Sequence, residues 1–308
     1  MRILVLGLTG YLGGHAAEQL RTLPGARLLG VGRTTAPGPA LDLATVGPRQ
    51  LADVTAAFAP DAVVNCAGAV GGDAVTLAEV NARGPAVLCA ALREAAPRAR
   101  LVHLGSAAEY GGTAHGERVT EESPTRPVGP YGATKLAGTV AVTASGLDSV
   151  VLRVGNPVGP GAPPAGLPGR VVQRLRQAGE DPDAVIRLGD LSAYRDFVDV
   201  RDIARAVLLA ATAAGPLPPV LNIGGGGARP VRELVHGLVR AAGFRGTVEE
   251  SRDGSPRSSD VPWQCSDISA AERALGWSPR YTLEDSLTAL WDSTRGGPAP
   301  APAGDRVR

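Results

Sequence analysis

A glycine-rich turn near the start of the chain limits this region to a strand followed at once by a helix. The apolar run Arg2 to Leu6 leads into Gly7-Leu-Thr-Gly-Tyr-Leu-Gly13, and a helical pattern with Ala16, Ala17 and Leu20 follows. Glycines at this spacing let the backbone turn tightly, let a pyrophosphate approach it, and expose the amides of a helix N-terminus. The turn predicts a dinucleotide site, and an ordinary strand-to-helix turn is the alternative. The residues expected at the cofactor here are Gly7, Thr9, Gly10, Tyr11, Leu12 and Gly13.

Apolar runs alternate with longer, alanine-rich amphipathic stretches through the first half of the chain. The runs are 2–6, 27–31, 62–65, 101–104 and 149–153. Continuous apolar runs separated by helical patterns are typical of parallel strands with crossover helices on both faces. The sequence therefore predicts an α/β protein with a doubly wound parallel sheet. A further run, Val220 to Ile223, follows a helical pattern over 201–214 and is expected to return to that sheet.

The pattern divides the chain into two parts and a tail. Residues 1–155 plus about 186–223 are expected to form the cofactor domain, with its sheet. Residues 156–185 plus 224–295 are richer in Pro, Gly and Arg and are expected to form a smaller α+β substrate lobe at the carboxyl ends of the strands. Residues 296–308 have a helix-breaking composition without an apolar period, which predicts a disordered tail.

The end of the second predicted strand bears on cofactor choice. An NAD enzyme places an acid there for the ribose 2′-hydroxyl, but this chain has Gly32-Arg33-Thr34. A guanidinium can hydrogen-bond a 2′-phosphate, so Arg33 favours NADP(H) over NAD(H), with a solvated surface arginine as the alternative. Further candidates along the adenine and ribose are Asp42, Leu43, Ala67 and Gly68, any of which could instead be structural.

The chemistry-bearing residues follow the fourth run. Ser106 comes at its end, and Tyr131 and Lys135 open a later helical stretch. Residues four apart share a helix face, so the phenol and the ammonium can point into one site. A tyrosine with a pKa of about 10 is a poor acid or base at neutral pH, and an adjacent cation favours its phenolate. Ser106 can hydrogen-bond a carbonyl or alkoxide oxygen as charge develops, so these three are the predicted catalytic residues.

Composition and charge give no indication of a nucleic-acid, membrane or metal partner. A formal net charge of +1 gives no bulk attraction to nucleic acid or to an anionic membrane. The four histidines and three cysteines lack metal-ligand spacing, so no metal site is expected. The short, glycine-broken N-terminal apolar run fits neither a signal peptide nor a membrane span. These features predict a reduced, cytoplasmic protein.

Together with further motifs, these residues resemble the extended short-chain dehydrogenase/reductase family, in particular its nucleotide-sugar epimerase, dehydratase and reductase group. The further motifs are Asn81 in Val-Asn-Ala-Arg-Gly, Asn156 in Gly-Asn-Pro-Val-Gly, 195–202 in Arg-Asp-Phe-Val-Asp-Val-Arg-Asp, and Leu275-Gly-Trp-Ser-Pro. The resemblance covers nearly the whole chain and implies a Rossmann-type NAD(P)-binding oxidoreductase, often a homodimer. Packing of the alanine-rich helices within one subunit is the alternative to the dimer.

The resemblance also implies substrate residues. Asn156 would line the sugar or phosphate, while Arg195 and Arg257 would flank a nucleotide pyrophosphate. Ala107 and Glu109 would lie along the substrate. The alternative for Arg195 is an internal salt bridge with one of the three aspartates at 196, 199 and 202. The alternative for Asn81 is support of the active-site backbone.

The residues after Ser106 discriminate among reactions. The family's 4,6-dehydratases carry an acid and a base where this chain has Ala107 and Ala108, so elimination of water is not expected. Three stretches resemble the branch that reduces GDP-4-keto-6-deoxymannose: Glu109-Tyr-Gly, residues 190–202, and Arg257-Ser-Ser-Asp-Val-Pro. The predicted function is therefore NADPH-dependent reduction of a nucleotide-linked 4-keto-6-deoxyhexose, as in deoxysugar biosynthesis. Alternatives are a nucleotide-sugar 4-epimerase, a non-catalytic NADP(H)-sensing protein, and an enzyme with a non-sugar carbonyl substrate.

Overall fold

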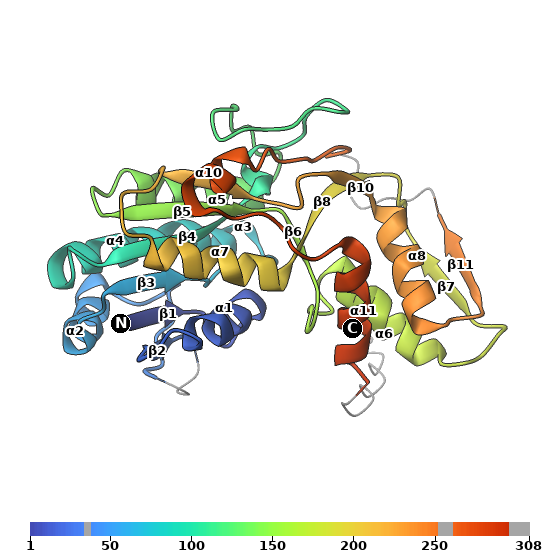
Figure 1. Ribbon diagram of the computed structural model, residues 1–308, viewed down its shortest axis with the longest axis horizontal. Coiled ribbons are helices and arrows are strands. Elements are labelled where there is room, and N and C mark those ends of the chain that lie inside the picture. The colour runs from blue at the N-terminus through green and yellow to red at the C-terminus, as the bar shows by residue number, and fades with distance from the viewer. Residues whose placement is uncertain (34–37, 252–260, 296–308) are drawn as a thin grey trace.

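A six-stranded parallel sheet forms the centre of the larger domain (Figure 1). The computed structural model describes residues 1–33, 38–251 and 261–295. The strand order is β2-β1-β3-β4-β5-β9. The strands are β1 Arg2–Leu6, β2 Arg27–Val31, β3 Ala62–Asn65, β4 Arg100–Ser106, β5 Ser149–Val154 and β9 Val220–Ile223. All six coincide with the predicted runs to within two residues, because strands buried on both faces read as continuous apolar sequence.

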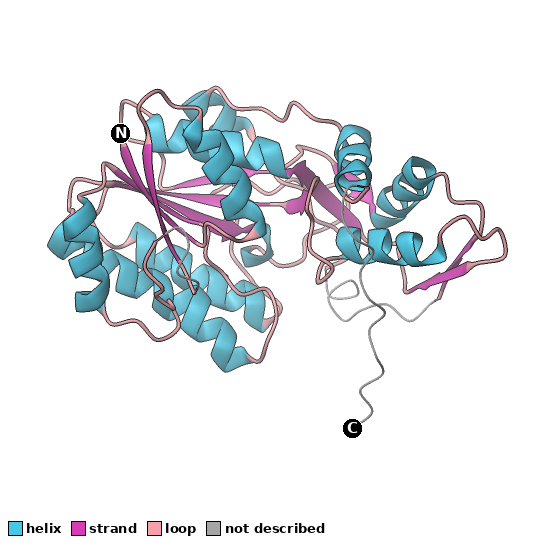
Figure 2. Ribbon diagram, turned by 90° about the horizontal axis from the view of Figure 1, so that it is seen from below, coloured by secondary structure: helices cyan, strands magenta, loops and turns pink. Residues whose placement is uncertain are grey.

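Helices cover both faces of this sheet, which Figure 2 shows nearly edge-on. One face packs against α1 and α7, and the other against α2, α4 and α5. The bounds are α1 Tyr11–Arg21, α2 Pro48–Phe58, α4 Gly84–Ala95, α5 Pro130–Thr143 and α7 Val200–Thr212. Shorter elements are α3 Ala74–Ala78, the π-helical turn η1 Glu79–Arg83 and the 3-10 turn η2 Ala107–Glu109. The predicted doubly wound α/β fold is confirmed.

A smaller lobe lies beyond the carboxyl ends of the strands (Figure 1). It contains a three-stranded sheet in the order β10-β8-β6 and a pair formed by β11 and β7. Its strands are β6 Asn156–Val158, β7 Val185–Leu188, β8 Tyr194–Asp199, β10 Ala228–Pro230 and β11 Thr247–Glu250. Its helices are α6 Leu167–Ala178, α8 Val231–Ala242 and α11 Leu283–Ser293. These elements enclose a separate apolar core.

Two segments lie in other parts of the fold than the sequence predicts. Strands β7 and β8 belong to the sheets of the small lobe, although 186–199 was expected in the cofactor domain. Strand β7 pairs with β11, and its inward residues Ile186 and Leu188 join the core of that lobe. Helix α10 (Ser269–Leu275) and Trp277 pack into the core of the larger domain instead of the lobe. Neither exchange is visible in local periodicity, because each depends on a partner distant in sequence.

The predicted tail, residues 296–308, lies outside the described residues. Within the described ranges, none of the helices has the length and apolarity that a bilayer span requires. The same ranges contain no group of three or more His, Cys, Asp or Glu side chains placed to hold a metal ion.

Candidate active site

The glycine turn between β1 and α1 forms a tight cradle. Gly7 has a φ of +75°, and a Cβ there would lie 2.8 Å from the backbone nitrogen of Ala67. A Cβ on Gly13 would lie 2.0 Å from the carbonyl oxygen of Gly7. Gly10 precedes the first turn of α1 and provides no side chain to cap its amides. The cradle therefore fits a pyrophosphate, because helix amides are open at a place where only glycine permits the close packing.

The other predicted residues of the turn differ in orientation. Thr9 is exposed, and Leu12 packs against the apolar core. The Tyr11 hydroxyl donates to the carbonyl oxygen of Gly159 at 3.3 Å, so this side chain points to the small lobe. Burial, together with the charge of Asp199, raises the pKa of the Tyr11 phenol. Tyr11 can therefore contribute its backbone to a cofactor, while its side chain links α1 to the second lobe.

The outer part of the cofactor surface follows β2. Gly32 accepts the Leu41 amide at 2.7 Å, which brings the 40–43 segment beside exposed Arg33. Asp42 is also exposed, and its Oδ1 accepts the Ala44 amide at 3.0 Å. Leu43 is buried with 6% exposure.

Arg83 holds the turn that contains Asp42 and Leu43. Its guanidinium donates to the carbonyl oxygens of Leu43, Ala44 and Val46 at 3.3, 3.0 and 2.9 Å. Arg83 was not among the predicted site residues, although it lies within the Val-Asn-Ala-Arg-Gly motif. An arginine in a recognised motif, two residues beyond Asn81, was the available signal.

Ser106, Tyr131 and Lys135 lie at the carboxyl end of β4. Ser106 is the last residue of that strand, and the Lys135 ammonium donates to the carbonyl oxygen of Leu104 at 2.5 Å. Half-buried Tyr131 is in the first turn of α5. The next residue, Gly132, packs against η2, where a Cβ would lie 2.4 Å from the carbonyl oxygen of Ala108. The structure thus brings the three predicted catalytic residues together.

The end of β3 lies beside the same group. A Cβ on Gly68 would lie 3.9 Å from the Lys135 ammonium. The Asn81 amide accepts from the Ala69 backbone nitrogen at 2.9 Å and donates to its carbonyl at 2.8 Å. It also donates to the Thr134 hydroxyl at 3.3 Å, so Asn81 ties this loop to α5. This is the backbone-supporting arrangement considered for Asn81.

Lys135 is the only lysine in the chain. It is 5% exposed, and burial lowers the pKa of its ammonium from 10.5 to about 8, against the opposing charge of Glu109. Burial also raises the pKa of the Cys66 thiol to about 12 and holds the pKa of His103 well below its usual value. The Lys135 ammonium therefore has a pKa closer to neutral pH than that of a lysine in water.

Two predicted substrate residues are buried. Ala107 is 2% exposed and Glu109 is 0% exposed. The two carboxylate oxygens of Glu109 accept from the Ser106 amide at 2.7 Å and from the Arg153 guanidinium at 2.8 Å. The expected position of Glu109 along the substrate does not agree with this arrangement, because its carboxylate points into the domain toward Arg153.

The substrate-lobe residues gather where β6 meets β8. Asn156 begins β6, and its amide donates to the Gln264 side-chain oxygen at 2.6 Å. Arg195 lies on β8, and its guanidinium donates to the carbonyl oxygens of Tyr194 and Val261 at 2.7 and 2.6 Å. Gln264 was not among the predicted site residues, because no motif in the sequence marks it. Arg257 lies outside the described residues.

The three aspartates near Arg195 serve the fold. Asp196 is buried, and its carboxylate accepts the Gly225 and Ser266 amides at 2.6 and 3.0 Å. Burial raises the pKa of Asp196 to about 6 against these hydrogen bonds. Asp199 caps α7 and pairs with Arg201 at 2.8 Å, while Asp202 accepts the Arg280 amide at 2.9 Å. Each carboxylate thus has an identified role in joining segments of the fold.

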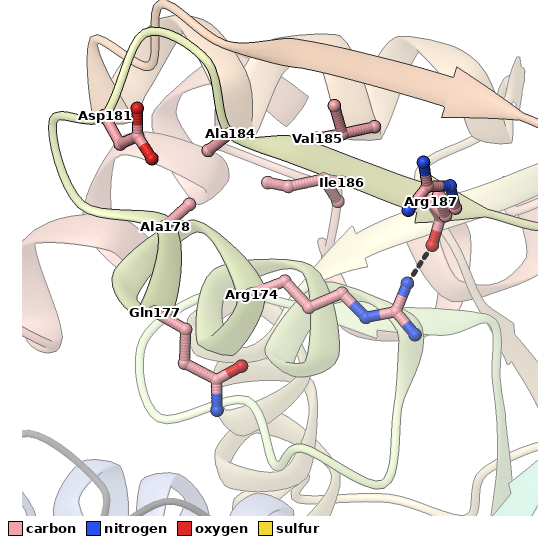
Figure 3. A pocket seen from close by; sticks show the side chains of 8 residues that line it. All are labelled: Arg174, Gln177, Ala178, Asp181, Ala184, Val185, Ile186 and Arg187. Atoms are coloured by element: carbon pink, nitrogen blue, oxygen red, sulfur yellow. Dashed lines mark hydrogen bonds between the residues drawn. The ribbon is translucent and has the colours of Figure 1, made fainter.

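A hollow of about 500 Å³ lies between α6 and β7 in the small lobe (Figure 3). The Arg174 guanidinium crosses it to donate to the carbonyl oxygen of Arg187. The lining residues are Arg174, Gln177, Ala178, Asp181, Ala184, Val185, Ile186 and Arg187. None of the predicted catalytic residues lines this hollow.

Known proteins resemble this chain over nearly all of its length. A dTDP-6-deoxy-L-talose 4-dehydrogenase (NAD(P)(+)) from Kitasatospora kifunensis is 37% identical over 311 aligned positions, covering 96% of each chain. A GDP-6-deoxy-D-mannose reductase from Pseudomonas aeruginosa is 27% identical, covering 95% of this chain and 97% of that protein. The solved structure of MoeE5 in complex with UDP-glucuronic acid and NAD matches with a TM-score of 0.82 at 27% identity, over 96% of this chain and 99% of that one.

The matched region contains both the glycine cradle and the three predicted catalytic residues. Residues 3–224 match the NAD dependent epimerase/dehydratase family, so the match includes all of the parallel sheet except Arg2, the first residue of β1. The expected family resemblance is confirmed. The chain belongs to the NAD dependent epimerase/dehydratase family and is an NAD(P)-dependent oxidoreductase of the extended short-chain type.

Proposed function

We propose that the protein reduces a nucleotide-linked 4-keto-6-deoxyhexose at C4 with NADPH, and that its nucleotide is dTDP. The observation that carries the proposal is the grouping of Ser106, Tyr131 and Lys135 at the end of β4, close to the glycine cradle. The relative with 37% identity is named for oxidation at C4 of a dTDP-6-deoxyhexose, and the reverse of that oxidation is the proposed reduction. This relative favours dTDP over the GDP-linked substrate that the sequence motifs suggest.

Tyr131 is the proposed acid that protonates the oxygen at C4. When bound, the nicotinamide cofactor supplies a hydride to the C4 carbonyl carbon. The Tyr131 hydroxyl then gives its proton to the oxygen at C4, and the Lys135 ammonium stabilises the phenolate that remains. Ser106 donates a hydrogen bond to the same oxygen as it gains negative charge. These three roles need no acid or base at positions 107 and 108, where the chain has alanine.

Binding of the nucleotide falls to the small lobe. Asn156 would bind the sugar or phosphate, and Arg195 and Arg257 the pyrophosphate, because guanidinium groups match phosphate oxygens in geometry and charge. Gln264 holds Asn156 by a 2.6 Å hydrogen bond and would orient its amide. Anchoring the nucleotide in this way would bring C4 of the sugar to the cofactor and to Tyr131.

The test is a hydride balance. Purified protein is mixed with NADPH and dTDP-4-keto-6-deoxyhexoses, with GDP- and UDP-linked analogues in parallel, while nicotinamide absorbance and product configuration are followed. We expect one NADPH consumed per carbinol formed, fastest with dTDP, and a rate at least roughly a hundredfold lower in the Tyr131→Phe variant. A 4-epimerase would interconvert sugar nucleotides without net NADPH loss, and that result would replace the reductase assignment. A protein that binds NADPH but converts none of these substrates would leave a sensing role or a different carbonyl substrate.

A further inference from the structure

Glu109 is a buried anion directly behind the catalytic group. Its side chain is 0% exposed and accepts the backbone amide of Ser106 at 2.7 Å. Its other oxygen pairs with the Arg153 guanidinium at 2.8 Å, and the Arg153 side chain is 6% exposed. Burying a carboxylate costs free energy unless it is paired and hydrogen-bonded, and Glu109 has both kinds of partner. Even a paired buried charge is weak evidence for stability alone, so we ask what Glu109 does for the active site.

The strand next to Glu109 leaves room for the carboxylate. A Cβ on Gly105 would lie 2.8 Å from Glu109 Oε1 and 2.8 Å from Val151 Cγ1. Side chains other than hydrogen at position 105 would therefore displace Glu109 or β5. The glycine before Ser106 and the glutamate after it are structurally coupled.

Glu109 and Lys135 hold the same short stretch of backbone. The Lys135 ammonium donates to the carbonyl of Leu104, and Glu109 accepts from the amide of Ser106, with Gly105 between them. A cation thus holds the Leu104 carbonyl at the end of β4, and an anion holds the Ser106 amide. The backbone that carries the Ser106 hydroxyl is held more firmly than a strand end with water as its partner.

Among the titratable groups discussed around Lys135, Glu109 is the one that carries a negative charge at pH 7. Cys66 at the end of β3 is a neutral thiol at pH 7, because burial raises its pKa to about 12. His103 on β4 is neutral, because burial and the charge of Lys135 lower its pKa. Tyr131 lies on the same helix, and Arg153 of β5 is the cation paired with Glu109. The negative charge that opposes proton loss from Lys135 is that of Glu109.

A second contact chain keeps the ion pair in place. The Arg153 guanidinium carbon lies 4.6 Å from the centre of the Tyr110 ring. The Tyr110 hydroxyl donates to the side-chain oxygen of Asn222 at 2.7 Å, and the Asn222 amide donates to the carbonyl oxygens of Val119 and Asp267 at 3.1 and 3.2 Å. Glu109 is therefore fixed through β5 and β9, independently of any bound substrate.

We propose that Glu109 is a positioning residue of the active site, which fixes the Ser106 backbone and supplies the counter-charge that keeps the Lys135 ammonium protonated. It does not touch the substrate, and Arg153 holds it in position. The inference rests on the proposed function for its effect on turnover, but its effect on Lys135 exists without substrate or cofactor.

The first test uses the single lysine as a probe. Protein labelled with ¹³Cε-lysine, carrying a lysine-free tag, gives one ε-carbon resonance whose pH midpoint reports Lys135 directly. In Glu109→Gln we expect this midpoint to move to lower pH by roughly one pH unit, because an opposing charge is lost while the side-chain shape is kept. The matched control is Asp148→Asn, which breaks the 2.9 Å ion pair with Arg100 at the other end of β4 and should leave the midpoint unchanged.

A second variant keeps the proposal testable if Glu109→Gln does not fold. Arg153→Met removes the cation that shares the Glu109 charge, so the Lys135 midpoint should move to higher pH. A purely structural role for the ion pair would give no shift, or shifts in the same direction, in the two variants. An unchanged midpoint in folded Glu109→Gln would overturn the proposal.

Activity separates this inference from the proposed function. With the best substrate, Glu109→Gln should lower kcat at least tenfold with little change in KM, and the alkaline limb of its kcat profile should follow the new Lys135 midpoint. If no sugar nucleotide is reduced by the wild type but the resonance still moves, the reductase assignment fails and the Glu109 counter-charge remains. A kcat profile that ignores the shifted midpoint would overturn the catalytic part of the inference.

Discussion

The indole nitrogen of Trp277 donates a 2.9 Å hydrogen bond to the main-chain oxygen of Asp202, and both residues are 0% exposed. The Asp202 carboxylate also accepts the amides of Arg280 and Tyr281 at 2.9 and 3.1 Å. These hydrogen bonds join two motifs that lie far apart in the sequence, Arg-Asp-Phe-Val-Asp-Val-Arg-Asp and Leu-Gly-Trp-Ser-Pro. Together the two motifs form one buried junction. This junction returns the chain from the small lobe to the core of the larger domain.

Trp277→Phe should destabilise the protein without affecting the chemistry. The substitution removes the indole donor from a buried carbonyl and leaves a gap, which costs about 1–3 kcal/mol in unfolding free energy. Urea unfolding checks the loss, and NADPH affinity should be unchanged in the folded protein. Trp263→Phe is the control, because Trp263 donates to the Glu117 carbonyl in a more exposed place and its loss should cost less. Equal costs in the two variants would contradict the role given to the Asp202–Trp277 junction.

Gly13→Ala should abolish dinucleotide binding, whereas Gly14→Ala should not. A Cβ at position 13 would lie 2.0 Å from the Gly7 carbonyl oxygen, while one at position 14 would lie 3.8 Å from the nearest atom, the Leu8 carbonyl oxygen. Both glycines are in α1, so the two substitutions change helix propensity alike. A difference between them therefore reports the close packing at Gly13. Gly14→Ala should be neutral or stabilise by up to about 1 kcal/mol. Calorimetric titration with NADPH checks both, and comparable affinities in the two variants would remove Gly13 from the cradle.

Tyr131→Phe should lose turnover and keep the cofactor. The change removes the transferable proton and leaves the ring, so kcat should fall roughly a hundredfold or more while the NADPH dissociation constant changes little. Steady-state rates with the best substrate and a fluorescence titration with NADPH measure the two quantities. Thr143→Ala serves as a control on the same helix, since the Thr143 hydroxyl donates to the Thr139 carbonyl at 3.0 Å at the far end of α5. A residual rate above about a tenth of wild type would remove Tyr131 from the acid role.

Lys135 should make folding stability rise with pH in an alkaline window. The pKa of its ammonium is lowered from 10.5 to about 8 in the folded protein. Between these values the unfolded chain binds more protons than the folded one, so this contribution to stability grows from pH 8 to 10.5 and is lost as pH falls through 8. The measurement is the unfolding free energy of wild type minus that of Lys135→Met, at several pH values. A difference that stays flat or falls across this window would show that the folded pKa is not lowered.

The sequence predicts the sheet well because its strands are buried on both faces. The run Ala62 to Asn65 is buried at every position and needs no knowledge of distant residues to be recognised. Glu109 shows the limit of the same reasoning. The Glu-Tyr-Gly motif suggested a substrate residue, but the direction of the carboxylate is decided by Arg153, 44 positions away, and by the space at Gly105. The position of β7 likewise depends on β11, which follows it by about sixty residues and is joined to it by backbone hydrogen bonds.

Arg33 should discriminate between the two nicotinamide cofactors. It is exposed just beyond β2, beside the 40–43 segment, and no acid occupies the end of that strand. A guanidinium at this place would form charge-assisted hydrogen bonds with the 2′-phosphate of NADPH, whereas the 2′-hydroxyl of NADH offers only an uncharged acceptor. Because the side chain is exposed, solvent reduces the gain to about 1 kcal/mol, or roughly fivefold in affinity.

The decisive comparison is between Arg33→Ala and Arg27→Ala, since Arg27 is also exposed and begins the same strand. Dissociation constants for NADPH and NADH are measured for the wild type and both variants at two salt concentrations. Arg33→Ala should weaken NADPH alone, and the wild-type preference should shrink at the higher salt, because ions screen an exposed contact. Arg27→Ala should leave both constants unchanged. If Arg33→Ala weakens both cofactors equally, or neither, Arg33 is a solvated surface residue and the preference for NADPH has no basis at this position.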